Sequence, residues 1–252
     1  MKRQRPGPTS TEIEVAAAVL AYNVALSRAI PRAAYVPANV AAAGLSIAAA
    51  RGLGVSPADL GLRRDRVGRG LRVGLAAALP VVAAVALGAT LPATRRYFAD
   101  ERARAGGAGH VLYEVLVRIP LGTALAEEAI FRGSVLGLLL QRHPGRTAAA
   151  MSSLLFGFWH VLPTLDTLQL DPAGAPAHGD PVRAGGAVAA SVLATAAGGC
   201  ALGWLRLRAD SVVAPAVAHA CLNSSAFLAA RLVAGSLPDR RPARAANLIL
   251  NG

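Results

Sequence analysis

Long apolar stretches, separated by short arginine-rich connections, run through the whole chain. A helix needs about 20 mostly apolar residues to cross a bilayer, and several stretches approach that length. They lie near Val15–Ile30, Ala33–Ala50, Val73–Leu91, Val111–Leu140, Thr147–Leu165, Ala187–Leu205 and Val212–Val233. This pattern predicts an all-α fold, a polytopic membrane helical bundle of about seven to eight transmembrane helices.

The composition agrees with this pattern. Hydrophobic residues make up 54% of the 252 residues and charged residues 16%, whereas about a quarter of the residues in a soluble domain are charged. The formal net charge is +12, but the arginines form short clusters between apolar runs and aromatic residues are few. We therefore expect the lipid bilayer as a partner and no nucleic acid. Lys2 is the only lysine among 26 basic residues, a usage typical of high-GC bacteria, so we expect a multi-pass protein of the bacterial inner membrane.

No internal repeat and no change of composition divides the chain. We expect a single integral membrane domain over residues 1–252, whose core catalytic helices span about 111–233. The loop Arg51–Arg72 holds six arginines. Its Pro57 and Gly61 predict a turn that leads into a short interfacial helix, and its charges favour contact with anionic lipid headgroups.

Small residues recur at four-residue spacing in two of the apolar stretches. The pairs are Gly133 with Gly137 and Gly199 with Gly203. In a membrane helix this spacing allows a neighbouring backbone to approach closely. We interpret both pairs as helix-packing positions.

The fourth apolar stretch carries an unusual number of ionisable residues. Glu114 and Arg118 are four residues apart, as are Glu128 and Arg132, so each pair can form along one helix. Glu127 has no cation three or four residues away. An unpaired carboxylate inside a membrane suits a general base; the alternative is that both adjacent glutamates serve ion pairs between helices. The stretch is longer than the bilayer is thick, so it must tilt, overshoot or bend at its proline.

Two later stretches carry histidines within apolar runs. Phe156 and His160 share one helix face, and so do His219 and Asn223. Histidine can move a proton, and an imidazole or an asparagine amide can hold an oxyanion. Hydrogen bonding between helices would use the same residue types. Together with Glu127, these side chains form an acid–base set suited to hydrolysis by an activated water.

The motifs EEAIFR (Glu127–Arg132), FGFWH (Phe156–His160) and HACLN (His219–Asn223) occur in this order. They resemble the EExxxR, FxxxH and HxxxN motifs of the CPBP family, also called ABI. This family of intramembrane proteases includes the CAAX prenyl endopeptidase and bacteriocin-processing and self-immunity proteins. The DLGLR stretch at Asp59 is similar to a weaker feature of the same family.

The resemblance implies a helical bundle that acts as a metal-independent glutamic endopeptidase on a peptide or protein substrate at the membrane. It implies catalytic roles for Glu127, His160, His219 and Asn223, and supporting roles for Glu128, Arg132 and Phe156. In that scheme Glu127 and His160 activate the attacking water. His219 and Asn223 hold the oxyanion, and the Glu128–Arg132 pair orients the site.

Other functions remain open from the sequence. We expect no cofactor, although Glu127, His160 and His219 have the ligand types of a zinc site with one open position. No HExxH motif accompanies them. The main alternative is a proteolytically inactive scaffold or a bacteriocin self-immunity protein. A proton-coupled transporter is a third class, which an inverted repeat would favour, and we see no such repeat.

Overall fold

The computed structural model describes residues 10–98, 106–170 and 181–236, and in these ranges it contains helices and no strand. The prediction of an all-α fold is confirmed. The α-helices are α1 (Ser10–Arg28), α2 (Tyr35–Gly52), α3 (Val67–Thr90), α4 (Pro92–Arg95), α5 (Ala108–Tyr113), α6 (Ala126–Glu128), α7 (Leu136–Leu140), α8 (Gly145–Trp159), α9 (Val161–Leu170), α10 (Pro181–Ala209) and α11 (Val213–Gly235). The π-helical segments are η5 (Glu114–Leu125) and η6 (Ala129–Val135), and the short 3-10 turns are η1 (Arg32–Ala34), η2 (Arg64–Arg66) and η3 (Arg96–Phe98).

Five helical stretches in the described part are long and apolar enough to cross a membrane. They are Arg32–Gly52, Arg64–Thr90, Gly145–Leu168, Pro181–Ala209 and Val213–Gly235. Each contains or overlaps a predicted span. The other two predicted spans correspond to α1 and to the charged run from α5 to α7, both of which are helical. These helices indicate a multi-pass membrane protein. The prediction of one domain over residues 1–252 stays a prediction.

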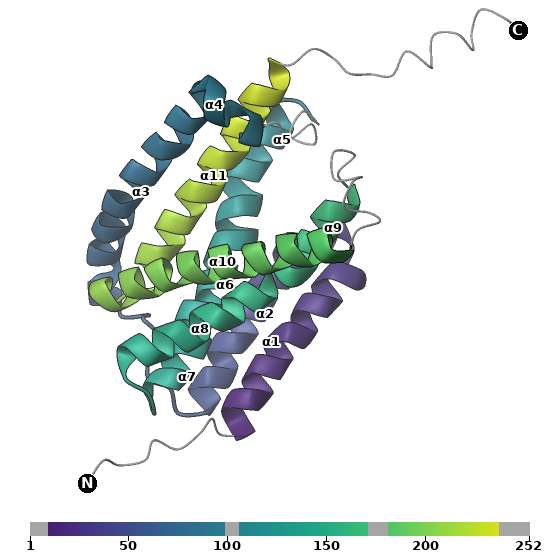
Figure 1. The fold of residues 1–252 in the computed structure, drawn as a ribbon. Helices are drawn as coiled ribbons and strands as arrows, with labels where there is room; N and C mark the ends of the chain where they lie inside the picture. Colours follow the sequence, from purple (N-terminus) through teal and green to yellow (C-terminus); the bar gives the residue numbers. More distant parts are fainter. Residues whose placement is uncertain (1–9, 99–105, 171–180, 237–252) are drawn as a thin grey trace, which may run out of the picture.

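The charged run begins with the exposed α5 at one end of the molecule and continues into α6, η6 and the start of α7, which are buried within the bundle (Figure 1). Its η5 segment packs against α11, and both η5 and η6 pack against α2. Figure 1 shows α3 and α11 side by side, and the two helices are in extensive contact. On the other side of the run, α10 packs along α8, while α1 contacts α8 and α9. The run with the motif EEAIFR is therefore covered on several sides by apolar helices.

Burial follows the pattern of a membrane protein. Large apolar side chains on α3, among them Leu75 and Leu79, are exposed, whereas Phe131, Phe156 and Trp159 are buried. Apolar side chains can face lipid without cost, and the interior holds small, aromatic and polar groups beside aliphatic ones. The aromatic cluster around η6 and α8 forms the core next to the charged residues.

Pro120 lies inside the π-helical segment η5. Proline has no N–H and clashes with the preceding turn of an α-helix. A wider turn of this kind relieves such a conflict within a continuous helix, and π-helical turns are frequent at functional sites. The sequence predicted a bend at this proline as one of three possibilities, and the structure shows a change in winding there.

The small residues predicted to pack closely do so. A Cβ at Gly203 would lie 3.2 Å from Ala149 Cβ on α8. At Gly137 it would lie 3.0 Å from the carbonyl oxygen of Asp59. The first glycine brings α10 close to α8. The second brings the loop before α3 onto the charged run.

The loop between α2 and α3 is fastened to the end of α10 by a buried arginine. Arg206 is 2% exposed, and its Nη2 donates hydrogen bonds to the carbonyl oxygens of Ala58 (3.1 Å) and Asp59 (2.7 Å). Val212 N donates to the carbonyl oxygen of Gly61 at 3.0 Å. Gly61 has a φ of +69°, a left-handed conformation that favours glycine. The loop thereby contacts both the end of α10 and the residue before α11.

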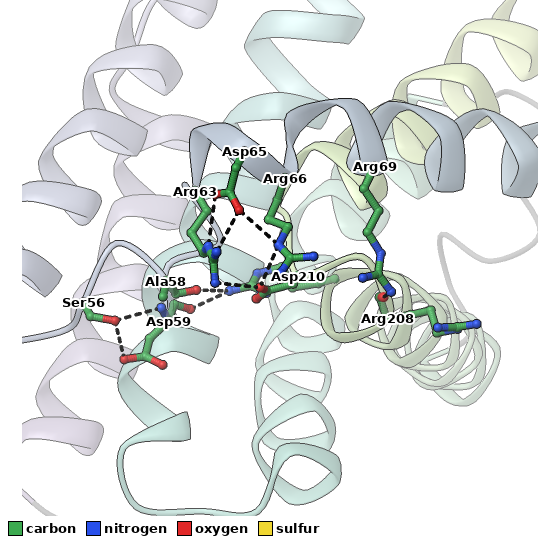
Figure 2. A network of polar contacts seen from close by, with 10 residues as sticks. Ser56, Ala58, Asp59, Arg63, Asp65, Arg66, Arg69, Arg208 and Asp210 are labelled. Atoms are coloured by element: carbon green, nitrogen blue, oxygen red, sulfur yellow. Dashed lines mark hydrogen bonds and ion pairs between the residues drawn. The ribbon is translucent and has the colours of Figure 1, made fainter.

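Ion pairs continue this network at the surface. Figure 2 shows Arg63 and Arg66 pointing toward both Asp65 and Asp210. The predicted interfacial helix is a 3-10 turn of three residues, Arg64–Arg66, that leads directly into α3. Contact of the remaining loop arginines with lipid headgroups stays a prediction.

The Gly61 position supplies a test of the Arg206 network. A Cβ at Gly61 would overlap Arg206 Nε, while Gly54, with a φ of +84°, has open space around its Cβ position. We expect Gly54→Ala to lower the free energy of unfolding by about 1–2 kcal/mol through left-handed strain alone. We expect Gly61→Ala to lower it by about 3–5 kcal/mol, because it also displaces a buried cation from its partners. Thermal unfolding of both variants in detergent measures the difference, and equal losses would contradict the role given to Arg206.

Candidate active site

The centre of the site is formed by the adjacent glutamates of α6, Glu127 and Glu128, and by Arg132 of η6. Arg132 Nη1 lies 3.1 Å from Glu128 Oε1, with side-chain exposures of 1% and 0%. The predicted pair at four-residue spacing is confirmed. The Glu114–Arg118 pair is confirmed as well, at 2.9 Å. An intramembrane charge is costly unless it is paired, and the Glu128–Arg132 contact places both charges of one pair inside the bundle.

His219 of α11 joins the two glutamates. Its Nδ1 lies 2.9 Å from Glu128 Oε1, and its Nε2 lies 3.9 Å from Glu127 Oε2. A carboxylate only accepts hydrogen bonds, so Nδ1 carries the proton in the contact with Glu128. Glu128 Oε1 therefore has two partners, one from η6 and one from α11.

Glu127 differs from Glu128 in its hydrogen-bond partners. It is buried, and its Oε2 has no hydrogen-bond partner among the described residues. Its charge interacts with His219 and with His160. The structure thus places two histidines from different helices near a glutamate that is free to accept a proton.

His160 lies at the break between α8 and α9. Its Nδ1 donates to the carbonyl oxygen of Phe156 at 2.8 Å, which leaves Nε2 for other partners. The sequence predicted a single span here, and Gly145–Leu168 is one of the helical stretches long enough to cross a membrane. The change from α8 to α9 at His160 within that stretch was not predicted. The histidine stands at the end of α8, and its backbone N–H donates to the carbonyl oxygen of Gly157 at 3.0 Å.

Phe156 contacts the charged and titratable groups at the centre of the site. Its ring centroid lies 4.6 Å from that of His160 and 6.1 Å from that of His219, both edge to face. The guanidinium carbon of Arg132 lies 4.3 Å from the same centroid. A cation over an aromatic face is stabilised, more strongly where water is excluded. The ring of Phe156 therefore contacts both histidines and the arginine of the site.

Asn223 follows His219 by one turn of α11 and is partly buried. No hydrogen bond joins its amide to another described residue. The sequence assigned His219 and Asn223 together to an oxyanion. The contact of His219 with Glu128 was not predicted, because nothing in the spacing of residues in one helix indicates a partner in another.

Tyr35 at the start of α2 is a neighbour of the site that the sequence did not indicate. Its hydroxyl lies 3.2 Å from Thr123 Oγ1, the guanidinium carbon of Arg118 lies 4.7 Å from its ring centroid, and it interacts electrostatically with Glu127. Thr123 precedes Glu127 by four residues. A single tyrosine in an apolar stretch offers no signal from which this neighbourhood could be found.

A cavity of about 170 Å³ lies away from these residues, between α1, α7 and α8. Its lining is apolar apart from Glu12, and it contains none of the motif residues. Within the described ranges, no group of three or more histidine, cysteine, aspartate or glutamate residues is placed to hold a metal ion. That the protein needs no cofactor stays a prediction.

Comparison with known proteins gives one family. The family model described as Rce1-like, type II CAAX prenyl endopeptidase Rce1-like, matches residues 110–225, a segment that contains all the motif residues. No curated protein and no solved structure matches the chain. The match confirms the resemblance drawn from the three motifs: the segment 110–225 is similar to the Rce1-like family of type II CAAX prenyl endopeptidases.

Proposed function

We propose that the protein is an intramembrane endopeptidase that hydrolyses a peptide bond with a water molecule activated by Glu127. The observation that carries the proposal is the unequal environment of the adjacent glutamates. Glu128 Oε1 has two partners, Arg132 and His219, whereas no hydrogen bond joins the carboxylate of Glu127 to a described residue. The Oε2 atom of each glutamate is buried without a hydrogen bond from a described residue. A general base needs such a free oxygen, and its neighbour's partners hold the segment in place.

Each motif residue has a role in the proposed reaction. Glu127 accepts a proton from water, whose oxygen then bonds to the scissile carbonyl carbon. His160, with Nδ1 bound to the Phe156 carbonyl oxygen, offers Nε2 as a second group that orients the water. When the tetrahedral intermediate collapses, the C–N bond breaks and the proton passes from Glu127 to the leaving amine. Water is thereby divided between the two new termini.

The developing oxyanion needs donors that are already oriented. We assign this role to the amide of Asn223 and to Nε2–H of His219, which lies one turn away on α11 and acts as an imidazolium with a proton on both ring nitrogens. The contact of His219 Nδ1 with Glu128 fixes the imidazole and directs Nε2 toward Glu127. The proposed reaction uses no metal ion. Its substrate is a peptide or protein at the membrane, and its proposed location is the bacterial inner membrane.

Glu127→Gln tests the proposed function, because it keeps the shape of the side chain and removes the base. We expect a peptide terminus that is present in cells with the native chain to be lost in cells with the variant. Sequencing of protein termini in membrane and secreted fractions measures this. Glu14→Gln, an exposed glutamate on α1, is the matched control and should leave every terminus unchanged. If no terminus changes while Glu127→Gln accumulates normally in the membrane, the protease function is wrong.

The two glutamates should also differ in their effect on stability. We expect Glu128→Gln to lower the free energy of unfolding by about 3–5 kcal/mol, because it leaves the buried Arg132 without a counter-charge. Glu127→Gln should lower it by about 1 kcal/mol or less, because Oε2 gives up no hydrogen bond. Thermal unfolding in detergent measures both. Equal losses would contradict the division of roles between the two residues.

A further inference from the structure

We propose that Gly199 of α10 is a positioning residue of this site: the missing side chain leaves the space that Arg132 occupies when it holds Glu128. The inference rests on the proposed function, in which the Glu128–Arg132 pair orients the reacting groups. It assigns a role to α10, a helix that carries none of the three motifs.

The space at Gly199 is occupied by the guanidinium of Arg132. A Cβ built at Gly199 would lie 2.9 Å from Arg132 Nη2 and 3.0 Å from Ser153 Cβ. Contacts below 3.0 Å do not occur for real Cβ atoms. Gly199 is itself buried. Even one methyl group at this position must therefore move the guanidinium.

The other neighbours of Arg132 restrict where the guanidinium can move. Its carbon lies 4.3 Å from the Phe156 ring centroid and 5.9 Å from that of Phe131, and the side chain is 1% exposed. A shift away from Gly199 therefore changes the contact of Nη1 with Glu128. Because the atom that yields is the end of a side chain, we expect the fold to tolerate the change better than the site does.

The displacement would spread to the reacting groups through one oxygen. Glu128 Oε1 contacts both Arg132 Nη1 and His219 Nδ1, and His219 Nε2 lies 3.9 Å from Glu127. A misplacement of about 1 Å in an active site can cost about 100-fold in rate. We expect Gly199→Ala to lower kcat for the cleavage that Glu127 carries out by at least about tenfold, with little change in KM.

Two glycines of the same helix are matched controls. Gly198 has open space around its Cβ position, so Gly198→Ala changes helix propensity without a contact. Gly203→Ala presses on Ala149 in the same α8–α10 interface but does not reach Arg132. Both controls should cleave at the native rate. If Gly203→Ala loses as much activity as Gly199→Ala, packing of the two helices explains the effect and the inference is wrong.

A second readout does not depend on activity. The ¹⁵N resonances of the His219 ring, assigned with His219→Gln, report its contact with Glu128 in the detergent-solubilised protein. We expect them to shift in Gly199→Ala and to stay unchanged in the two controls. If Glu127→Gln leaves cleavage intact, the proposed function fails, and these resonances still decide the role of Gly199. Unchanged resonances in Gly199→Ala would overturn the inference.

Arg132→Lys supplies the rescue. Lysine has one terminal nitrogen, so the atom that meets the new methyl group is absent while one cation remains for Glu128. We expect Gly199→Ala to shift the His219 resonances less in the Arg132→Lys background than in the native one. If Gly199→Ala alone does not accumulate in the membrane, the double variant decides: recovered accumulation supports a clash with Arg132, and no recovery overturns it.

Discussion

One carboxylate oxygen at the centre of the bundle connects the elements of the site. Glu128 Oε1 lies 3.1 Å from Arg132 Nη1 and 2.9 Å from His219 Nδ1. A charge buried in a membrane protein must find partners within the protein, because the hydrocarbon core of the bilayer supplies none. Glu128 meets this requirement with one partner from its own run of helix and one from α11. The same contacts that make its charge tolerable also fix the position of His219.

The partners of Glu128 leave the neighbouring glutamate available. Glu127 lies next to Glu128 in the same short helix α6, and its Oε2 has no hydrogen bond from a described residue. The short α6 that carries both glutamates lies between two π-helical segments. π-helical turns are frequent at functional sites. Here the change in winding accompanies two adjacent carboxylates with different partners: Glu128 has two at Oε1, and Glu127 has no hydrogen bond to a described residue.

The fold was predictable to the extent that local patterns determine it. The apolar stretches predicted the helices, because only internally hydrogen-bonded helices can cross a bilayer as single segments. The pairs Glu114–Arg118 and Glu128–Arg132 were predictable because both partners lie on one helix. The contact of His219 with Glu128, the break at His160 and the neighbourhood of Tyr35 were not. These depend on how helices cross, and the spacing of residues within one helix contains no information about the crossing.

The part of the chain before the family match contributes to the site through its backbone. The segment 110–225 carries all the motifs, but the loop before α3 packs on the same run of helix, with the Leu60 carbonyl oxygen 3.6 Å from the Cβ position of Gly133. Arg206 holds this loop by its carbonyl oxygens and not by a carboxylate. Any residue type supplies a carbonyl oxygen, so such a contact leaves little trace in the sequence. The motifs therefore indicate the side chains that we propose to react, while the glycines and the loop packed around them can be identified only in three dimensions.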